Sequence, residues 1–253
     1  MRKMMSFQKL IYLIFLFILV GCKNKIQNQK ILIVSQDKKH AFRDWISQVD
    51  AKIRIVDFYN LPKDSMQYYL LNSDGIIMSG GEDINPSLYN HSDYKEICGE
   101  IDNYRDSLEI LLLKHAMKSD KPLLAICRGH QLMNVINGGS LIPDIPTFIK
   151  DTTIQHRTKK GTHPITCVKN SWIDKNFTSN DFMVNSRHHQ CIDRIAKNFK
   201  VAAKSPDGVI ESIELKDPSD NRFIIGVQFH PENMNDSLSR YLRKIFLSQL
   251  YLE

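Results

Sequence analysis

The chain has 253 residues, 42% of them hydrophobic and 25% charged, so one domain with a sizeable core is expected and intrinsic disorder is excluded. The formal net charge of +6 falls to +3 without residues 1–21, which hold three basic and no acidic residues. No basic stripe with interleaved aromatic residues occurs in the sequence, so no nucleic-acid partner is expected.

Residues 1–21 are predicted to be a lipoprotein signal peptide. Three basic residues among the first nine precede an apolar run at 10–20, which is short for a bilayer span. The run ends in Leu-Val-Gly-Cys22, which resembles the bacterial lipoprotein box and implies cleavage before Cys22 and lipid on its thiol. We therefore expect an exported protein, on the periplasmic or cell-surface side, that is held to a membrane through Cys22 with residues 22–29 as a tether. An ordinary signal peptide and an N-terminal anchor helix are the alternatives.

Residues 30–253 are predicted to form one domain in which strands first alternate with helices. Apolar runs predict strands at 30–35, 53–58, 75–78 and 123–126. Apolar residues at helical spacing predict helices near 42–49, 63–72, 101–119 and 129–137. This alternation predicts an α/β fold with a mostly parallel sheet covered by helices on both faces.

The pattern changes after residue 140. Residues 141–160 have the prolines and charges of a loop, and Asp207-Gly208 is a hairpin signal. Short strand-like runs occupy 164–168, 182–186, 201–204, 209–215 and 222–229. They predict an antiparallel extension of the sheet or a flap beside it, and residues 235–251 predict a closing amphipathic helix.

Cys127 lies between the strand at 123–126 and the next helix, with almost no loop and with Ala125 and Gly129 two positions away. Such a strand-to-helix turn is typical of a nucleophile elbow, which exposes a reactive atom above a sheet. The N-terminus of the helix would favour a thiolate and a developing oxyanion. A lone cysteine after an apolar strand is more often a buried core thiol. Whether Cys127 is catalytic therefore depends on whether the sequence also provides the other residues of an active site.

A cysteine nucleophile needs a base, and the base needs an orienting partner. His230 and Glu232 stand two apart at the end of the last predicted strand, where they share a face, although each alone would be taken as structural or solvent-facing. Gly80 and Gly81 end another strand, either in a plain turn or with N–H groups aimed at a ligand. With the N–H of Arg128, either glycine would complete an oxyanion hole.

These stretches resemble the class I glutamine amidotransferase family, which has a Cys-His-Glu triad on a flavodoxin-like sheet. Those that carry the resemblance are Ser79–Gly81, Ala125–Gln131 and Gly226–Glu232. Further stretches are similar to the gamma-glutamyl-gamma-aminobutyrate hydrolase branch of the family, namely Gly80–Tyr89, Asp102–Asp106, Val184–Gln190 and Asp207–Glu211. The resemblance implies a flavodoxin-like fold over roughly residues 30–250.

The resemblance also implies roles for individual residues. Cys127 would be the nucleophile, His230 the general base and acid, and Glu232 the residue that orients it. Gln131 would contact a glutamyl group, and the opposite rim would be lined by Asn185, His188, His189 and Gln190. Packing and metal binding are alternatives for His188 and His189, but no third ligand is evident, so no metal site is predicted, and His163 is expected to be structural.

The implied reaction is hydrolysis of a gamma-glutamyl amide through a glutamyl thioester, with a small gamma-glutamyl compound as substrate and no metal or organic cofactor. The alternatives are a glutaminase subunit that passes ammonia to a synthase, an amidase acting on gamma-glutamyl bonds of cell-wall peptides, and a non-catalytic binding lipoprotein. The leaving amine is not defined, a homo-oligomer is left open, and one disulfide among Cys98, Cys167 and Cys191 is compatible with export.

Overall fold

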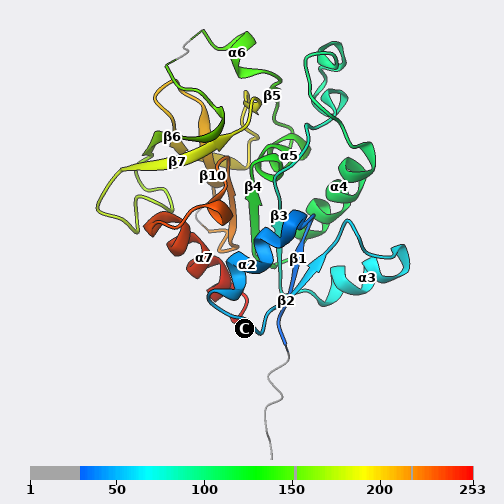
Figure 1. Cartoon of the computed structure of the whole chain (residues 1–253). Coiled ribbons are helices and arrows are strands. Elements are labelled where there is room, and N and C mark those ends of the chain that lie inside the picture. Colours follow the sequence, from blue (N-terminus) through cyan, green and yellow to red (C-terminus); the bar gives the residue numbers. More distant parts are fainter. Residues whose placement is uncertain (1–28, 151–152, 218, 253) are drawn as a thin grey trace, which may run out of the picture.

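A mixed sheet of nine strands runs through the computed structural model, which describes residues 29–150, 153–217 and 219–252 (Figure 1). In chain order its strands are β1 (Ile31–Val34), β2 (Arg54–Asp57), β3 (Gly75–Met78), β4 (Leu123–Ile126), β6 (Arg157–Cys167), β7 (Asp181–Arg187), β9 (Phe199–Lys204), β10 (Ile210–Leu215) and β11 (Ile224–Val227). Their order in space is β2-β1-β3-β4-β11-β10-β9-β6-β7.

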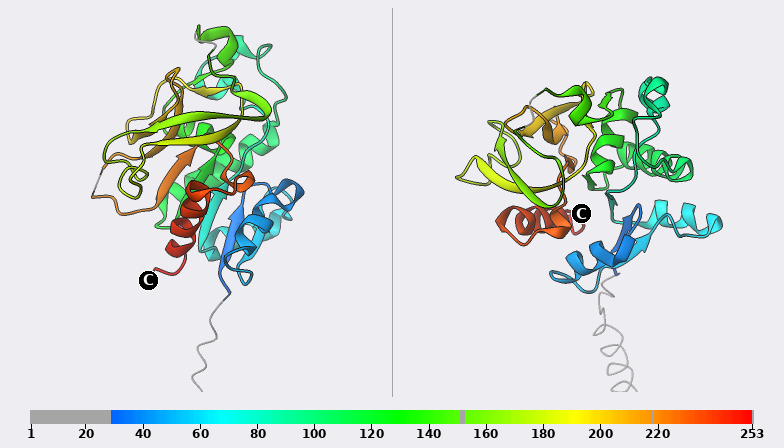
Figure 2. Two further views of the ribbon diagram at one scale, coloured as in Figure 1. Left: turned by 60° about the vertical axis from the view of Figure 1, so that its left-hand side comes forward. Right: turned by 45° about the horizontal axis from the view of Figure 1, so that its top comes forward.

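The first five strands of this order are parallel and the remaining ones are antiparallel to their neighbours. β1 pairs in parallel with β2 and β3, and β4 pairs in parallel with β3 and β11. From β11 onward, the β10, β9, β6 and β7 pairings are antiparallel. The predicted α/β fold with a mostly parallel core and an antiparallel extension is therefore confirmed, and the extension stands as a separate lobe beside the core (Figure 2).

Helices cover both faces of the parallel core. The helices are α2 (Ala41–Ser47), α3 (Lys63–Asn72), α4 (Asn103–Lys118), α5 (Arg128–Ile136), α6 (Ile145–Phe148) and α7 (Ser237–Gln249). Along β1, Leu32 and Val34 face one apolar cluster with α2 and α7, whereas Ile33 faces another with α3, α4 and α5. Because both faces are buried, β4 is apolar at every position, as parallel central strands usually are.

Side chains at the helix ends fix where the helices begin. The carboxylate of Asp102 accepts a hydrogen bond from the backbone N–H of Arg105 at 3.0 Å, and that of Asp236 accepts one from Ser239 at 2.8 Å. Both are N-caps, which satisfy donors that a helix leaves unpaired at its first turn. The helices predicted at 101–119 and 235–251 are thus shortened by one or two residues at each end.

The prediction of a loop at 141–160 is wrong in part. Strand β5 (Leu141–Ile142) pairs with β8 (Cys191–Ile192) in a second, two-stranded sheet, and α6 follows with Asp144 as its N-cap. A two-residue strand carries no periodicity, and its partner lies about fifty residues away in the sequence. Local pattern therefore could not reveal it.

Four cysteines lie in the described residues, and all are free thiols, so the one disulfide left open among Cys98, Cys167 and Cys191 does not form. The predicted signal peptide, the predicted lipidation site at Cys22 and most of the predicted tether lie outside the described residues. Within 29–150, 153–217 and 219–252, none of the helices has the length and apolar character needed to span a membrane.

Candidate active site

Cys127 lies in a sharp turn between β4 and α5. Its backbone has φ 51° and ψ −107°, a conformation that costs a non-glycine residue of the order of 1–3 kcal/mol and persists only where the surroundings enforce it. Two hydrogen bonds hold Cys127 in this conformation. Its N–H donates to Val227 O on β11 at 2.8 Å, and its carbonyl oxygen accepts from Gln131 N in α5 at 3.1 Å. The elbow predicted from the sequence is thus present in the backbone.

The end of β11 brings His230 to this cysteine. His230 Nδ1 lies 2.7 Å from Glu232 Oε1, so the carboxylate fixes the ring and leaves Nε2 free to face another group. Burial disfavours the imidazolium, but the adjacent Cys127 and the Glu232 carboxylate outweigh it and raise the pKa of His230 to about 10. The surroundings therefore favour the imidazolium form of His230 beside Cys127.

Gly80 lies against both of these side chains. A Cβ on Gly80 would stand 2.5 Å from His230 Cε1 and 3.4 Å from Cys127 Cβ, so only glycine fits. The backbone N–H groups of Gly80, Gly81 and Arg128 make no hydrogen bond to any other described residue. The structure thus brings the three predicted oxyanion donors and the nucleophile together, with their N–H groups available to a ligand.

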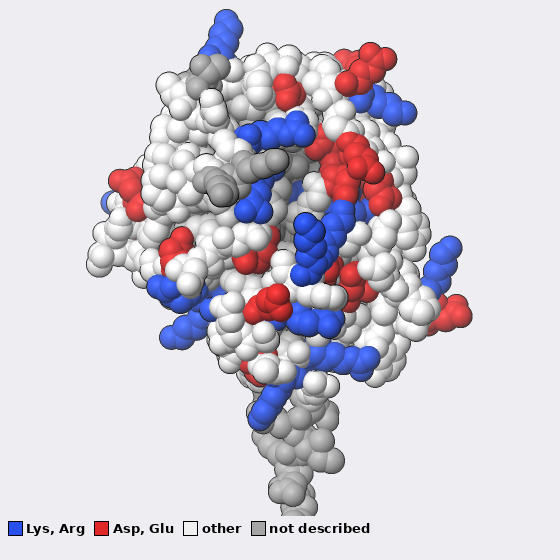
Figure 3. All heavy atoms as spheres, viewed as in Figure 1, with Lys and Arg blue, Asp and Glu red and all other residues white. Residues whose placement is uncertain are grey.

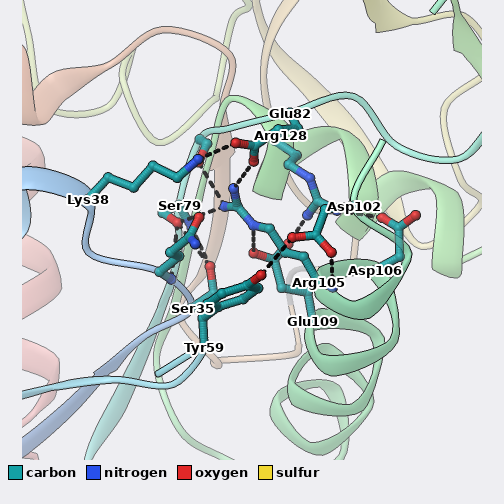
Figure 4. Close-up of polar contacts among 12 residues, drawn as sticks. Ser35, Lys38, Tyr59, Ser79, Glu82, Asp102, Arg105, Asp106, Glu109 and Arg128 are labelled. Carbon is teal, nitrogen blue, oxygen red and sulfur yellow. Dashed lines mark hydrogen bonds and ion pairs between the residues drawn. The ribbon is translucent and has the colours of Figure 1, made fainter. Parts of the chain in front are cut away.

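A buried guanidinium supports the glycine loop from behind (Figure 4). The fully buried Arg105, on α4, donates from Nη2 to Gly80 O at 2.8 Å and to Ser79 Oγ at 3.1 Å. It also donates from Nη1 to Glu82 at 2.7 Å and from Nε to Glu109 at 2.8 Å. Because four of its five N–H groups are held by separate acceptors, Arg105 holds the loop in one conformation.

The side chain of Arg128 belongs to the same buried network and points away from the nucleophile. Its guanidinium donates to Asp106 and Glu109, whereas Lys38 and Arg105 both donate to Glu82 (Figure 4). Burial raises the pKa of Glu82, but the hydrogen bonds from Lys38, the Glu82 backbone N–H and Arg105 outweigh it and lower this pKa to about 2. Only the backbone of Arg128 can therefore serve the site, as predicted for an oxyanion donor.

The predicted rim residue Asn185, on β7, contacts the backbone of His230. Asn185 Nδ2 donates to His230 O at 2.8 Å, and His230 N donates to Asn185 Oδ1 at the same distance. Both ends of the amide are thereby occupied. In the structure Asn185 positions the general base candidate, and its contact with substrate stays a prediction.

Gln131 and Gln190 form part of a wall beside the nucleophile. Gln131 Nε2 donates to Gln190 O at 2.9 Å and to Gln228 Oε1 at 3.1 Å. Gln228 Nε2 in turn lies 3.6 Å from Cys127 Sγ, and Gln190 Nε2 lies 3.5 Å from Cys98 Sγ. Sequence reasoning missed Gln228, although it directly follows β11 and stands two residues before His230.

The two adjacent histidines point in different directions. His189 is held between two carboxylates, with Nε2 2.8 Å from Asp83 and Nδ1 2.9 Å from Asp144, and these bonds raise its pKa. It thereby ties the loop after β3 to the start of α6. His188 is directed into the antiparallel lobe towards Glu211.

A cavity of about 230 Å³ adjoins Cys127. Basic and acidic side chains face each other across a hollow on this side of the molecule (Figure 3). The residues that line the cavity are Gly81, Glu82, Asp83, Gly99, Glu100, Cys127, Arg128, Gln131, Arg157, Arg187, His188, His189 and Gln190. Its volume suits a group of amino-acid size, because sites for drug-sized ligands start near 300 Å³.

Two unpaired arginines stand on the basic side of this cavity. Arg157 on β6 is the direct cross-strand partner of Arg187 on β7, and like charges in such a position repel each other. Neither guanidinium forms an ion pair within the described part of the chain. The pair therefore offers a place for an anionic group of a ligand.

Comparison with known proteins agrees with this architecture. The profile of the family described as Peptidase C26 matches residues 19–232. Protein NtpR of Enterococcus hirae is 37% identical over 175 residues, which cover 68% of this chain and 72% of NtpR. Gamma-glutamyl-gamma-aminobutyrate hydrolase PuuD of Escherichia coli strain K12 is 28% identical over 194 residues, which cover 72% of this chain and 74% of PuuD. The crystal structure of a glutamine amidotransferase from Thermotoga maritima superposes with a TM-score of 0.54 at 14% identity, covering 88% of this chain and 90% of that one, and shows the shared fold.

Proposed function

Because the chain belongs to the Peptidase C26 family, we propose that it is a cysteine hydrolase that cleaves gamma-glutamyl amide bonds through Cys127, His230 and Glu232. One observation carries the proposal. A cysteine held in a strained elbow faces a histidine–glutamate pair, and unused backbone N–H groups lie beside it. This set of groups is what acyl transfer to a thiol requires.

The proposed reaction begins with attack of the Cys127 thiolate on the side-chain carbonyl of the glutamyl group. The developing oxyanion accepts hydrogen bonds from the backbone N–H of Arg128 and of Gly80 or Gly81. His230 donates its proton to the leaving amine as the C–N bond breaks. His230 then takes a proton from water, which attacks the thioester, releases glutamate and restores the thiolate–imidazolium pair.

The charges of the cavity support a glutamyl group as the part that is recognised. A glutamyl moiety carries an α-ammonium and an α-carboxylate, so its recognition needs both signs of charge. We assign the carboxylate to Arg157 and Arg187, and the ammonium to the acidic side formed by Glu82 and Glu100. This division explains why two arginines face each other across β6 and β7 without counter-ions.

The leaving amine would lie on the other side of the His230 ring. A groove of about 520 Å³ opens there, with Lys38, Phe42, Trp45, Gly80 and Glu232 among its lining residues. It is wider than the cavity beside Cys127 and open to one side. A groove of this kind fits a family of amines of different length, and the proposal covers gamma-glutamyl-gamma-aminobutyrate and related gamma-glutamyl amines.

Glutamate release by the full-length chain, kept in detergent, tests the proposal. The substrates are gamma-glutamyl-gamma-aminobutyrate, other gamma-glutamyl amines, glutamine and a gamma-glutamyl wall peptide, each with Cys127→Ala and with Cys167→Ala as a matched buried-thiol control. We expect release from the gamma-glutamyl amines that Cys127→Ala abolishes and Cys167→Ala retains.

The other outcomes contradict this assignment in distinct ways. Preference for glutamine would favour a glutaminase subunit. Turnover of the wall peptide alone would favour an amidase of the cell wall. Binding of gamma-glutamyl compounds without turnover by the intact chain would favour a binding lipoprotein. Labelling of the chain with a radioactive fatty acid, lost in Cys22→Ala, would test the proposed membrane anchor separately.

A further inference from the structure

Three histidines and a glutamate converge in the antiparallel lobe, next to the cavity wall. They are His156 just before β6, His163 on β6, His188 just after β7 and Glu211 on β10, and all four are buried. One nitrogen or oxygen atom from each lies within 4.8 Å of the others. Glu211 Oε1 is 3.6 Å from His156 Nδ1, 3.5 Å from His163 Nε2 and 3.8 Å from His188 Nε2.

Hydrogen bonds on the outer side of each ring determine where its proton sits. His163 Nδ1 is 3.1 Å from Pro164 O, and His188 Nδ1 is 2.9 Å from Gln190 O. A carbonyl oxygen only accepts, so both protons lie on Nδ1 and both Nε2 atoms carry lone pairs. His156 Nε2 is likewise 2.8 Å from the Asp207 carboxylate, which leaves the lone pair of Nδ1 facing inward.

These inward atoms are not satisfied by the protein. His163 Nε2, His188 Nε2 and both carboxylate oxygens of Glu211 have no hydrogen-bond partner within the described residues. The inward contact of His156 Nδ1 is to Ser186 Oγ at 3.3 Å. Four acceptors therefore face one another in a buried space, and a shared proton could join only one pair of them. Buried polar atoms left in this state destabilise the fold.

We propose that His156, His163, His188 and Glu211 bind one divalent transition-metal ion of the zinc type. Tetrahedral Zn²⁺ holds its ligands at about 2.0–2.1 Å, so neighbouring ligand atoms stand about 3.3 Å apart. The separations of 3.5–3.8 Å from Glu211 to each histidine need only a small contraction. Three imidazoles disfavour Ca²⁺ and Mg²⁺, which prefer oxygen ligands.

The surroundings match those of metal-bound histidines. Such rings almost always donate their other N–H to a carboxylate or a backbone carbonyl, which fixes the tautomer. Here Asp207, Pro164 O and Gln190 O fill this role for the three rings. Because four protein ligands close the coordination sphere and none is exposed, the ion would be structural and would join β6, β7 and β10.

This site differs from the sequence-based expectation, which found no third metal ligand to join His188 and His189 and predicted no metal site. The ligands come from four segments between residues 156 and 211, and only the hairpins of the extension bring them together. They have none of the short spacings that mark a metal site in a sequence. The inference stands independently of the proposed reaction.

Metal binding by the full-length chain in detergent tests the inference. The chain is stripped with a chelator and titrated with Zn²⁺ or Co²⁺, with metal content, the visible spectrum of Co²⁺ and Tm as readouts. We expect one equivalent of bound metal, the intense visible bands of tetrahedral Co²⁺, and a rise in Tm of about 5–15 °C at saturating zinc. The isosteric variant Glu211→Gln is expected to weaken binding at least ~100-fold.

His40→Gln serves as the matched control, because His40 is exposed and far from the cluster, and this variant should bind like the wild type. Circular dichroism checks that each variant is folded. Absence of stoichiometric metal and of the Co²⁺ bands in the folded wild-type chain would overturn the inference even if Glu211→Gln does not fold. Unchanged affinity in Glu211→Gln would overturn it as well.

Discussion

Replacement of Glu232 by glutamine tests whether the carboxylate sets the charge state of His230. The Glu232→Gln variant would keep the shape of the side chain but lose the negative charge 2.7 Å from Nδ1. Both groups are largely buried, with side-chain exposures of 13% for His230 and 5% for Glu232, so solvent screens their interaction weakly. The variant should therefore favour the neutral imidazole.

The size of the effect follows from the contact. A hydrogen bond to a charged group contributes about 1.5–3 kcal/mol, and one pKa unit corresponds to about 1.4 kcal/mol. The pKa of His230, which the native site raises to about 10, should therefore fall by about 1–2 units in Glu232→Gln. The high-pH limb of kcat/KM, where the imidazolium is lost, should move down by the same amount.

The pH dependence of kcat/KM and an NMR titration of the His230 Cε1 proton measure this shift, the second without reference to turnover. Glu96→Gln makes the same chemical change at an exposed position and should leave both curves in place. If both curves of Glu232→Gln coincide with those of the wild type, the carboxylate does not control the charge of His230, and the proposed role of Glu232 is refuted.

The remaining predictions concern the supports of this site. Gly80→Ala should lower kcat by more than ~10-fold with little loss of stability, measured by steady-state kinetics and Tm, because its Cβ would displace the His230 ring. Asn185→Ala removes two hydrogen bonds to the His230 backbone and should cost about 1–3 kcal/mol in denaturant unfolding and lower kcat more than it changes KM. Arg105→Met removes one of the two basic partners of Glu82 and of Glu109 and should cost about 1.5–3 kcal/mol, measured in the same way. If one of these variants matches the wild type in kinetics and stability, the contact that it removes or disturbs does not support the site.

Much of the fold could be predicted because its signals are local. Strands of the parallel core are buried on both faces, so β4 appears in the sequence as an uninterrupted apolar run. The elbow at Cys127 could be predicted for the same reason, since strand, turn and helix follow one another within about fifteen residues. His230 and Glu232 could be predicted because they stand two residues apart shortly after one apolar strand.

The missed parts depend on contacts between distant segments. Arg105 and Glu109 are four residues apart on a helix, a spacing that usually marks an exposed ion pair, yet here both are buried behind the glycine loop. Burial of a charge is decided by what packs over it, which no local pattern records. The same applies to Glu211, whose alternating strand position predicts only which face it takes, not which histidines lie across from it.

The proposed metal site and the candidate active site share a backbone segment, and this yields a last prediction. Gln190 O accepts hydrogen bonds from both His188 Nδ1 and Gln131 Nε2, so it links a proposed metal ligand to the cavity wall. Loss of metal should loosen this wall without moving Cys127, which β11 and α5 hold separately. Chelation should therefore raise KM several-fold while the rate of Cys127 alkylation by iodoacetamide changes little. If chelation raises KM and slows the alkylation of Cys127 by the same factor, the two sites form one cooperative unit and the metal does not control the wall separately.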